Sequence, residues 1–134
     1  MNQNKHFNLE FSYDTDVDSI FINIVDEYVY KESIELEEGI ILDFDTNGIP
    51  VALEILDISS LFGIDKISFE NIQDIQMKIK INSCINLELI MVLLVKDRKV
   101  KQELDKFIKN DIILMVYKYW YMKIKTDHLN ILKL

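Results

Sequence analysis

Residues 39–56 read GIILDFDTNGIPVALEIL, two alternating apolar runs on either side of Asn47-Gly48. An Asn-Gly pair in this setting is the strongest short-range signal for a β-hairpin, because both residues tolerate the positive φ of a type I′ turn. Pro50 then falls at a non-hydrogen-bonded position, where its missing N–H is not needed. The stretch therefore predicts a hairpin with one buried face, on which three apolar pairs meet: Phe44 with Val51, Leu42 with Leu53, and Ile40 with Ile55.

The same period of two continues on both sides of the hairpin. It predicts three strands before the hairpin and two after it, over residues 7–13, 20–24, 34–36, 75–81 and 87–95. Between the two groups, residues 57–62 are typical of one helical turn, with Ser59 or Ser60 as its cap and Gly63 as its stop. Over residues 8–62 we expect a β-meander that includes the hairpin, and the strands over 75–81 and 87–95 fit one more hairpin.

From Asp97 onward the period changes. Apolar residues at i, i+4, i+7 and i+8 predict one longer C-terminal helix near residues 98–109, with Asp97 as N-cap and Asn110 as stop. The apolar positions of that helix are Val100, Leu104, Phe107 and Ile108. Residues 112–125 leave strand and helix open, because their aromatic and β-branched content favours a strand while their length suits a helix.

The predicted fold is α+β, with residues 1–134 forming a single domain. We expect an antiparallel β-sheet of about five to seven strands, with the short helical turn after Asp57 and the C-terminal helix covering one face or edge. A chain of 134 residues that is 49% hydrophobic is large enough for one such core.

The residue types needed for catalysis are scarce. Three glycines and one proline exclude a glycine-rich phosphate loop. Cys84, His6 and His128 are the only cysteine and histidines, which excludes a disulfide framework and the usual zinc ligand sets. No histidine lies near Cys84 in the sequence, and no carboxylate pair is marked by apolar surroundings. We therefore expect no enzyme activity, no catalytic residue and no cofactor.

The charge pattern and the N-terminal segment indicate the compartment and the partners. A formal net charge of −8 argues against nucleic-acid binding. Residues 1–11 do not resemble a secretory signal, and the longest apolar run, residues 89–95, is too short to cross a bilayer. We expect a cytoplasmic protein that binds neither nucleic acid nor a membrane.

The charge is divided unevenly along the chain. Residues 1–65 carry 2 lysines against 15 acidic residues, whereas residues 66–134 carry 13 basic and 8 acidic residues. The simpler interpretation is that both halves contribute solvated faces of one domain. The functional hypothesis is a small non-enzymatic interaction protein, whose acidic N-terminal face meets a basic protein partner or a second copy of the chain.

The alternative function is a calcium-type site. Asp43, Asp45, Asn47, Gly48 and Glu54 satisfy the calcium-loop pattern D-x-[DN]-x-[DN]-G-x5-E. Such a loop lies between helices, whereas the flanks here alternate with a period of two, which favours the hairpin. A divalent-cation site remains as the alternative, built from carboxylates on the solvent face of the hairpin (Asp43, Asp45 and Glu54) and from a nearby acidic turn (Asp14 and Asp16).

Residues 8–62 resemble a small prokaryotic family known as domain of unknown function 2283. The matching motifs are Tyr13-Asp14, Asp18-Ser19-Ile20-Phe21-Ile22, the run 39–45, Gly48, and Leu53-Glu54-Ile55-Leu56-Asp57-Ile58-Ser59. The chain departs from the family pattern at Ala52, where glycine is expected, and at Ile58, where a small residue is usual. The resemblance implies a compact antiparallel β-fold with a short helical turn and no established activity. It also implies that some members act beside a partner in two-gene modules such as toxin and antitoxin pairs.

Overall fold

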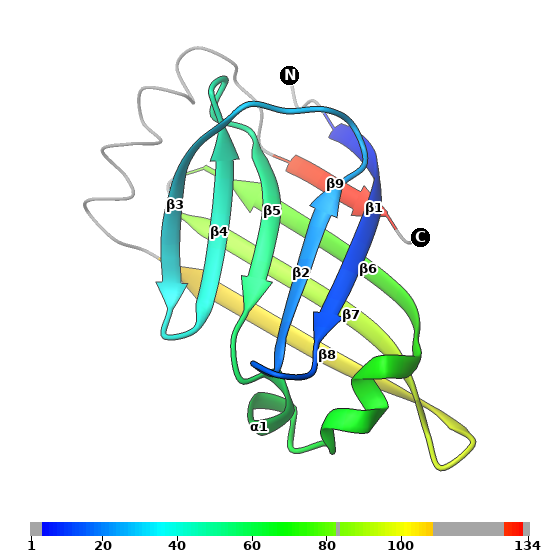
Figure 1. Cartoon of the computed structure of the whole chain (residues 1–134). Coiled ribbons are helices and arrows are strands. Elements are labelled where there is room, and N and C mark those ends of the chain that lie inside the picture. The colour runs from blue at the N-terminus through cyan, green and yellow to red at the C-terminus, as the bar shows by residue number, and fades with distance from the viewer. Residues whose placement is uncertain (1–3, 83, 109–127, 133–134) are drawn as a thin grey trace.

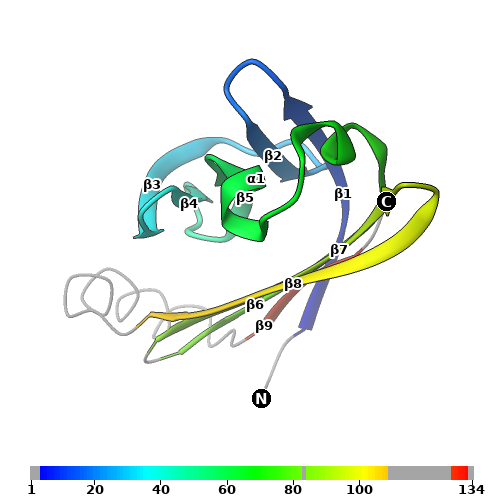
Figure 2. The same cartoon turned by 90° about the horizontal axis from the view of Figure 1, so that it is seen from below.

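The chain folds into two β-sheets that lie face to face and share their first strand (Figures 1 and 2). The computed structural model describes residues 4–82, 84–108 and 128–132. Residues 112–125, for which the sequence leaves strand and helix open, lie outside this described part. Within it, neither helical segment has the length and apolarity needed to cross a membrane.

The nine described strands form one continuous hydrogen-bonded order that folds back on itself. The first sheet runs in the order β3 (Tyr30–Glu37), β4 (Ile40–Asp45), β5 (Pro50–Ile55), β2 (Ser19–Ile24) and β1 (Asn4–Asp14). The expected meander over residues 8–62 is therefore wrong, because β2 pairs with β5 instead of β3. The second sheet continues with β9 (His128–Leu132), β6 (Ile72–Ile81), β7 (Ile85–Val95) and β8 (Arg98–Ile108).

Strand β1 belongs to both sheets. Its residues from Leu9 to Asp14 pair antiparallel with β2, and its residues from Asn4 to Asn8 pair parallel with β9. Every other described pairing is antiparallel. One strand thus carries the chain's backbone hydrogen bonding from the first layer into the second.

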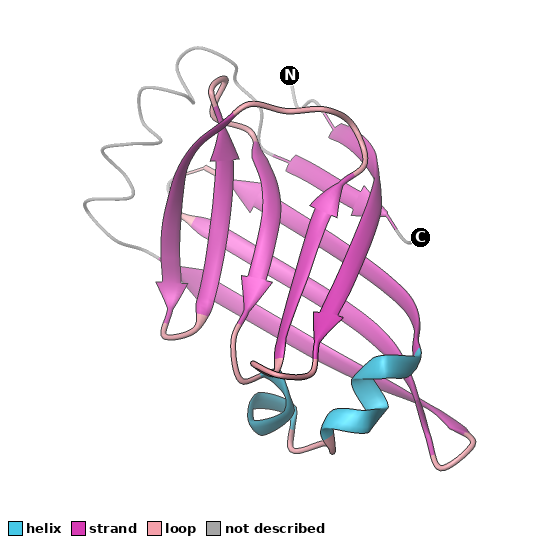
Figure 3. Cartoon of the chain, viewed as in Figure 1, coloured by secondary structure: helices cyan, strands magenta, loops and turns pink. Residues whose placement is uncertain are grey.

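The core lies between the two inward faces. Alternate residues of each strand are buried there, as the period of two predicts. Two short helical segments, α1 (Ile58–Phe62) and η1 (Lys66–Asn71), lie at one end of the two layers and add Ile58 and Phe69 to the core (Figure 3). Large aliphatic side chains from both sheets have at most 1% of their surface exposed, among them Ile22, Leu42, Leu53, Ile79, Leu87 and Leu89.

The predicted hairpin forms between β4 and β5, with Ile40 opposite Ile55 and Leu42 opposite Leu53. The predicted turn type is wrong. A register shift after Asp43 brings Phe44 opposite Pro50 instead of Val51, and the tip becomes a three-residue loop. Gly48 alone in the loop has a positive φ, of 78°.

The physical reason is the side chain of Asp45. Its Oδ1 accepts hydrogen bonds from the backbone N–H groups of Asn47 at 2.9 Å and Ile49 at 2.8 Å. An aspartate side chain that accepts a hydrogen bond from the backbone N–H two residues ahead stabilises a three-residue hairpin loop. In such a loop only the last residue, here Gly48, adopts the left-handed conformation.

Replacement of Gly48 by alanine should lower the free energy of unfolding by about 1 kcal/mol, because a Cβ is poorly tolerated at positive φ. Asn47→Ala is the matched control and should cost clearly less, since Asn47 does not have a positive φ. Chemical denaturation of both variants provides the measurement. Equal losses would indicate the type I′ turn instead.

The predicted C-terminal helix near 98–109 is wrong, because residues 98–108 form strand β8. The pairing of β7 with β8 runs without interruption from Val95 opposite Arg98 to Ile85 opposite Ile108. Lys96 and Asp97 both have positive φ values, 49° and 62°, so they form a two-residue type I′ turn, and Asp97 is no N-cap. Asn110, its expected stop, lies outside the described residues.

The pattern was ambiguous because three of its four apolar positions fit both periods. Val100, Leu104 and Ile108 are four apart, which suits a helix, but all are even-numbered, which places them on one face of a strand. Phe107 falls on the other face and is 65% exposed. The fold class is accordingly predominantly β, with nine described strands where five to seven were expected and only a minor helical part.

The two assignments of residues 96–108 predict opposite effects of one double substitution. Lys96→Asn with Asp97→Gly installs the preferred type I′ sequence, so in a hairpin it should raise the free energy of unfolding by about 1 kcal/mol. At a helix N-terminus the same change would remove a cap and destabilise the protein. Thermal unfolding of the double variant decides between a rise and a fall in Tm.

Candidate functional site

Among the proposed cation ligands, the two hairpin aspartates already accept hydrogen bonds within the chain. Asp45 caps its own turn, as described above. Oδ1 of Asp43 accepts a hydrogen bond from the Ser33 hydroxyl at 2.6 Å, and that hydroxyl lies 2.7 Å from the hydroxyl of Tyr30. These contacts connect β3 to β4, so both aspartates have a structural role.

The acidic β1–β2 turn lies at the far end of the sheet from the hairpin tip. Ile55 pairs with both Ile20 and Ile40, so the turn that precedes β2 lies where β4 begins. Asp45 ends β4 five residues later, about 17 Å away at the rise of a strand. Asp14 and Asp16 are therefore not near Asp45, and Asp14 Oδ1 instead accepts the backbone N–H of Asp16 at 2.9 Å.

Glu54 lies between Ile41 and Phe21 on the same outward face as Asp43. Across the described ranges, no group of three or more histidine, cysteine, aspartate or glutamate residues is placed to hold a metal ion. The geometry thus brings together only part of the expected ligand set and lends the calcium hypothesis no support.

What the structure does assemble is an acidic face, the outward surface of the first sheet. Its charged members are Glu10 on β1, Glu35 on β3, Asp43 and Asp45 on β4, and Glu54 on β5. Strands β2, β4 and β5 contain no lysine or arginine. Phe21 and Ile41 are half-buried beside Glu54 on this face. Carboxylates and apolar side chains are therefore interleaved on one surface.

The loop between β2 and β3, residues 25–29, borders this face. Burial raises the pKa of Tyr28, and the negative charges of Asp43 and Glu10 raise it further. The backbone N–H of Thr46 donates to the carbonyl of Val29 at 3.0 Å, so the loop is attached to the hairpin tip. Three apolar side chains at this end are more than half exposed: Val25, Val29 and Tyr30.

A second polar cluster, which sequence reasoning missed, is the Asp18 clasp, formed by Tyr13, Asp18 and Ser59. Asp18 is only 5% exposed and accepts hydrogen bonds from the hydroxyls of Tyr13 and Ser59, both at 2.6 Å. The backbone N–H of Ser59 lies 3.3 Å from the same carboxylate. Ser59, expected to cap α1, therefore binds the β1–β2 turn instead; Asp57 occupies the cap position without a side-chain hydrogen bond, and Gly63 ends the helix as predicted.

The clasp shifts the pKa values of both acidic members. Burial by itself would raise the pKa of Asp18, but the hydrogen bonds from Ser59 and Tyr13 and the nearby charge of Lys66 outweigh it and hold this pKa below its ordinary value. Burial, followed by the hydrogen bond and charge of Asp18, raises the pKa of Tyr13. The pair is thus held as carboxylate and phenol, the states in which the hydrogen bond forms.

A dependence of stability on pH, at both the acid and the alkaline end, follows from these shifts. The lowered pKa of Asp18 contributes stability that is fully present above about pH 4 and is lost as the pH falls through the folded value. The raised pKa of Tyr13 contributes stability that is present below about pH 10 and is lost as the pH rises further. Asp18→Asn should lower the free energy of unfolding at pH 7 by about 2 kcal/mol and flatten the acid limb.

Tyr13→Phe should flatten the alkaline limb with a smaller loss at pH 7, since it removes one donor and leaves the Ser59 hydrogen bonds intact. Chemical denaturation at a series of pH values measures both variants. Acid and alkaline limbs that match those of the wild type would show that the clasp is not the titrating unit.

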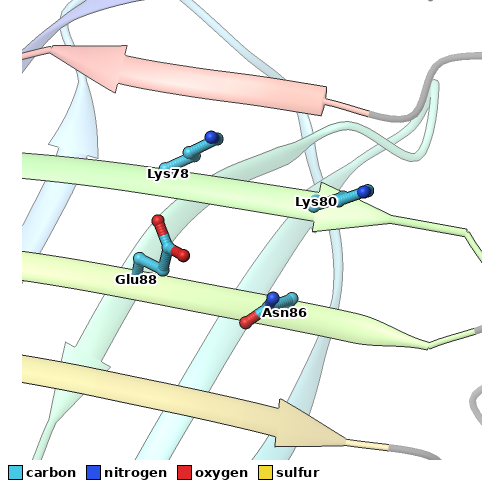
Figure 4. Close-up of a pocket in the computed structure, with 4 residues that line it drawn as sticks. All are labelled: Lys78, Lys80, Asn86 and Glu88. Atoms are coloured by element: carbon cyan, nitrogen blue, oxygen red, sulfur yellow. The ribbon is translucent and has the colours of Figure 1, made fainter.

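The second sheet carries a small hollow of about 160 Å³ on its outward face (Figure 4). Its lining residues are Lys78 and Lys80 on β6, and Asn86 and Glu88 on β7. Lys78 is paired across the strands with Glu88, and Lys80 with Asn86. The Oδ1 atom of Asn86 is buried without a hydrogen-bond partner. The hollow is thus lined by side chains of opposite charge, and its lining residues do not include a paired nucleophile and base.

Cys84 lies in the turn between β6 and β7. Its backbone N–H and its thiol both lie within hydrogen-bond distance of Asn82 Oδ1, at 3.3 and 3.4 Å. The thiol therefore contributes to the turn, and among its described contacts no histidine serves as a base for it.

Residues 10–59 match the family model described as Protein of unknown function (DUF2283). The resemblance to this family is thereby confirmed over that segment. No curated protein and no solved structure matches the chain. The matched segment covers most of the first sheet and ends at Ser59 in α1, so the Asp18 clasp joins residues near its two ends.

Proposed function

We propose that this protein is a non-enzymatic interaction module whose acidic face binds a basic surface of a protein partner. The observation that carries the proposal is the composition of that face. Its carboxylates project from four of the five strands, β1, β3, β4 and β5. Strands β2, β4 and β5 contain no lysine or arginine to neutralise them. A surface with an excess of one sign of charge attracts a partner of the opposite sign and orients it during association.

The chemistry of the partner follows from the side chains on and beside the face. Exposed Tyr30 is paired with Asp45, exposed Val25 and Val29 lie in the bordering loop, and half-buried Phe21 and Ile41 lie beside Glu54. Aromatic and aliphatic groups surrounded by charge are typical of protein interfaces, where the apolar part contributes affinity and the charged rim sets the orientation. We therefore propose a protein partner that presents lysine or arginine around an apolar centre.

The remaining polar groups favour binding over catalysis. The Ser59 hydroxyl and the Asp18 carboxylate are engaged with each other, and Cys84 is engaged in its turn. We accordingly propose that the protein has no enzymatic activity and binds no cofactor. A cytoplasmic location is part of the same proposal, because a free, half-buried thiol suits a reducing compartment.

The test compares two matched charge reversals. One variant is Glu54→Lys, within β5 on the acidic face. The other is Glu88→Lys, within β7 on the outward face of the second sheet. Tagged wild type and Glu88→Lys should capture the same basic protein from a lysate of the native host. Glu54→Lys should lose it, and the capture should weaken as salt increases. Mass spectrometry identifies the captured protein.

The purified pair then allows a direct measurement of affinity by calorimetry. Loss of binding in Glu88→Lys but not in Glu54→Lys would overturn the proposal, as would binding that is insensitive to both substitutions. A circular dichroism spectrum equal to that of the wild type confirms that each variant is folded.

A further inference from the structure

The two outer strands of the described sheet differ in their capacity to pair with another strand. β3 is interrupted by two register shifts against β4, and its charges are Lys31, Glu32, Glu35 and Glu37. Bulges and like charges of this kind protect a sheet edge from pairing. β8, at the other edge, is eleven residues long and pairs with β7 without a single shift. Of the two edges, β8 is the regular one.

The register of the β7–β8 hairpin determines which backbone groups of β8 remain available. Because Val95 and Arg98 close a two-residue turn, the even-numbered residues of β8 direct their N–H and C=O groups toward β7. The odd-numbered residues direct theirs away from β7, toward an edge that no other described strand covers. Their side chains project from the outward face, and their order is Lys99, Lys101, Glu103, Asp105 and Phe107.

We infer that β8 pairs antiparallel with β8 of a second copy of the chain, about a twofold axis at Gln102. Within one chain the ammonium group of Lys101 already lies 3.0 Å from the carboxylate of Glu103. In the dimer, this register also places Lys101 opposite Glu103 of the other copy. It also places Lys99 opposite Asp105. Two basic residues followed by two acidic residues on one face are self-complementary only when the strand meets itself in the reverse direction.

Neighbouring registers lack this match. An axis at Glu103 places the two copies of Glu103 opposite each other, and an axis at Lys101 does the same with lysine. An axis at Leu104 sets Glu103 against Asp105, which repel each other. The charges therefore favour one register among those that keep the two outward faces on the same side.

The inward face is compatible with the same axis. Val100 comes opposite Leu104, which extends the apolar core across the dimer. Arg98 comes opposite Lys106, whose ammonium group lies 2.7 Å from the carboxylate of Glu37 on β3 of its own chain. That ion pair neutralises the lysine, so the pairing does not bring two uncompensated cations together.

This pairing goes beyond the proposed function and uses the other sheet, so either proposal can fail alone. Sedimentation velocity at low salt should show a dimer for the wild type. Lys101→Glu and Glu103→Lys should each weaken dimerisation by about tenfold or more, because each places like charges opposite one another twice. The double variant Lys101→Glu/Glu103→Lys restores opposite charges and should restore the dimer.

Lys78→Glu is the matched control, since it makes the same change on the same sheet face two strands away from the edge, and it should leave the dimer intact. A wild type that sediments as a monomer over its whole soluble range would overturn the inference. So would single variants that dimerise like the wild type, or a double variant that stays as weak as the single ones.

A cysteine substitution tests the axis itself. In a Cys84→Ser background, Gln102→Cys would face its own copy across a non-hydrogen-bonded pair, where the spacing of Cα atoms suits a disulfide. Mild oxidation should give a covalent dimer for Gln102→Cys. Asp105→Cys, which would face Lys99, should give little. Equal cross-linking at both positions would overturn the register.

Discussion

The hydrogen bonding of the buried Asp18 carboxylate is the interaction on which one end of the molecule depends, the end where α1 and η1 lie. A charge with 5% exposure is costly unless its oxygens are satisfied, and here two hydroxyls and one backbone N–H supply the hydrogen bonds. The backbone of the turn is also attached to α1, because the carbonyl of Asp18 accepts a hydrogen bond from the N–H of Ile58 at 3.1 Å. Tyr13 in turn lies against the ring of Phe69, with 5.5 Å between ring centroids. Asp18 thus connects the β1–β2 turn to α1, and Tyr13 adds the contact with η1.

Strand β1 extends this constraint to the second sheet. Because its two halves pair with β2 and with β9, the family-like segment and the C-terminal strands share one hydrogen-bonded ladder. Side chains from β6 and β7 then supply the apolar layer opposite Ile22 and Leu42. The family-matched segment therefore provides one layer of the core, and residues that follow it provide the other.

The local apolar pattern predicted the secondary structure correctly wherever only one period, that of a strand or that of a helix, fitted the residues. The alternation around Asn47-Gly48 predicted the pairing of Leu42 with Leu53, but not the loop, because the Asp45 carboxylate competes with the ideal type I′ geometry. For residues 98–108 both periods fitted, and only pairing with β7 decides between them. Asp18 and Ser59 are 41 residues apart, and no local signal indicates their contact. The large distance between Asp16 and Asp45 likewise could not be predicted without the strand order.

The distribution of charge gives the two edges of the described sheet opposite properties. On β3 three glutamates accompany one lysine, and bulges disturb the ladder, so a second β3 is repelled and poorly matched. On β8 basic residues come first and acidic residues follow, so a reversed copy is attracted. The acidic face has no such internal match, since strands β2, β4 and β5 carry no cation and β3 carries one lysine against three glutamates. A surface of that kind needs its cations from another molecule, whereas β8 finds them in its own sequence.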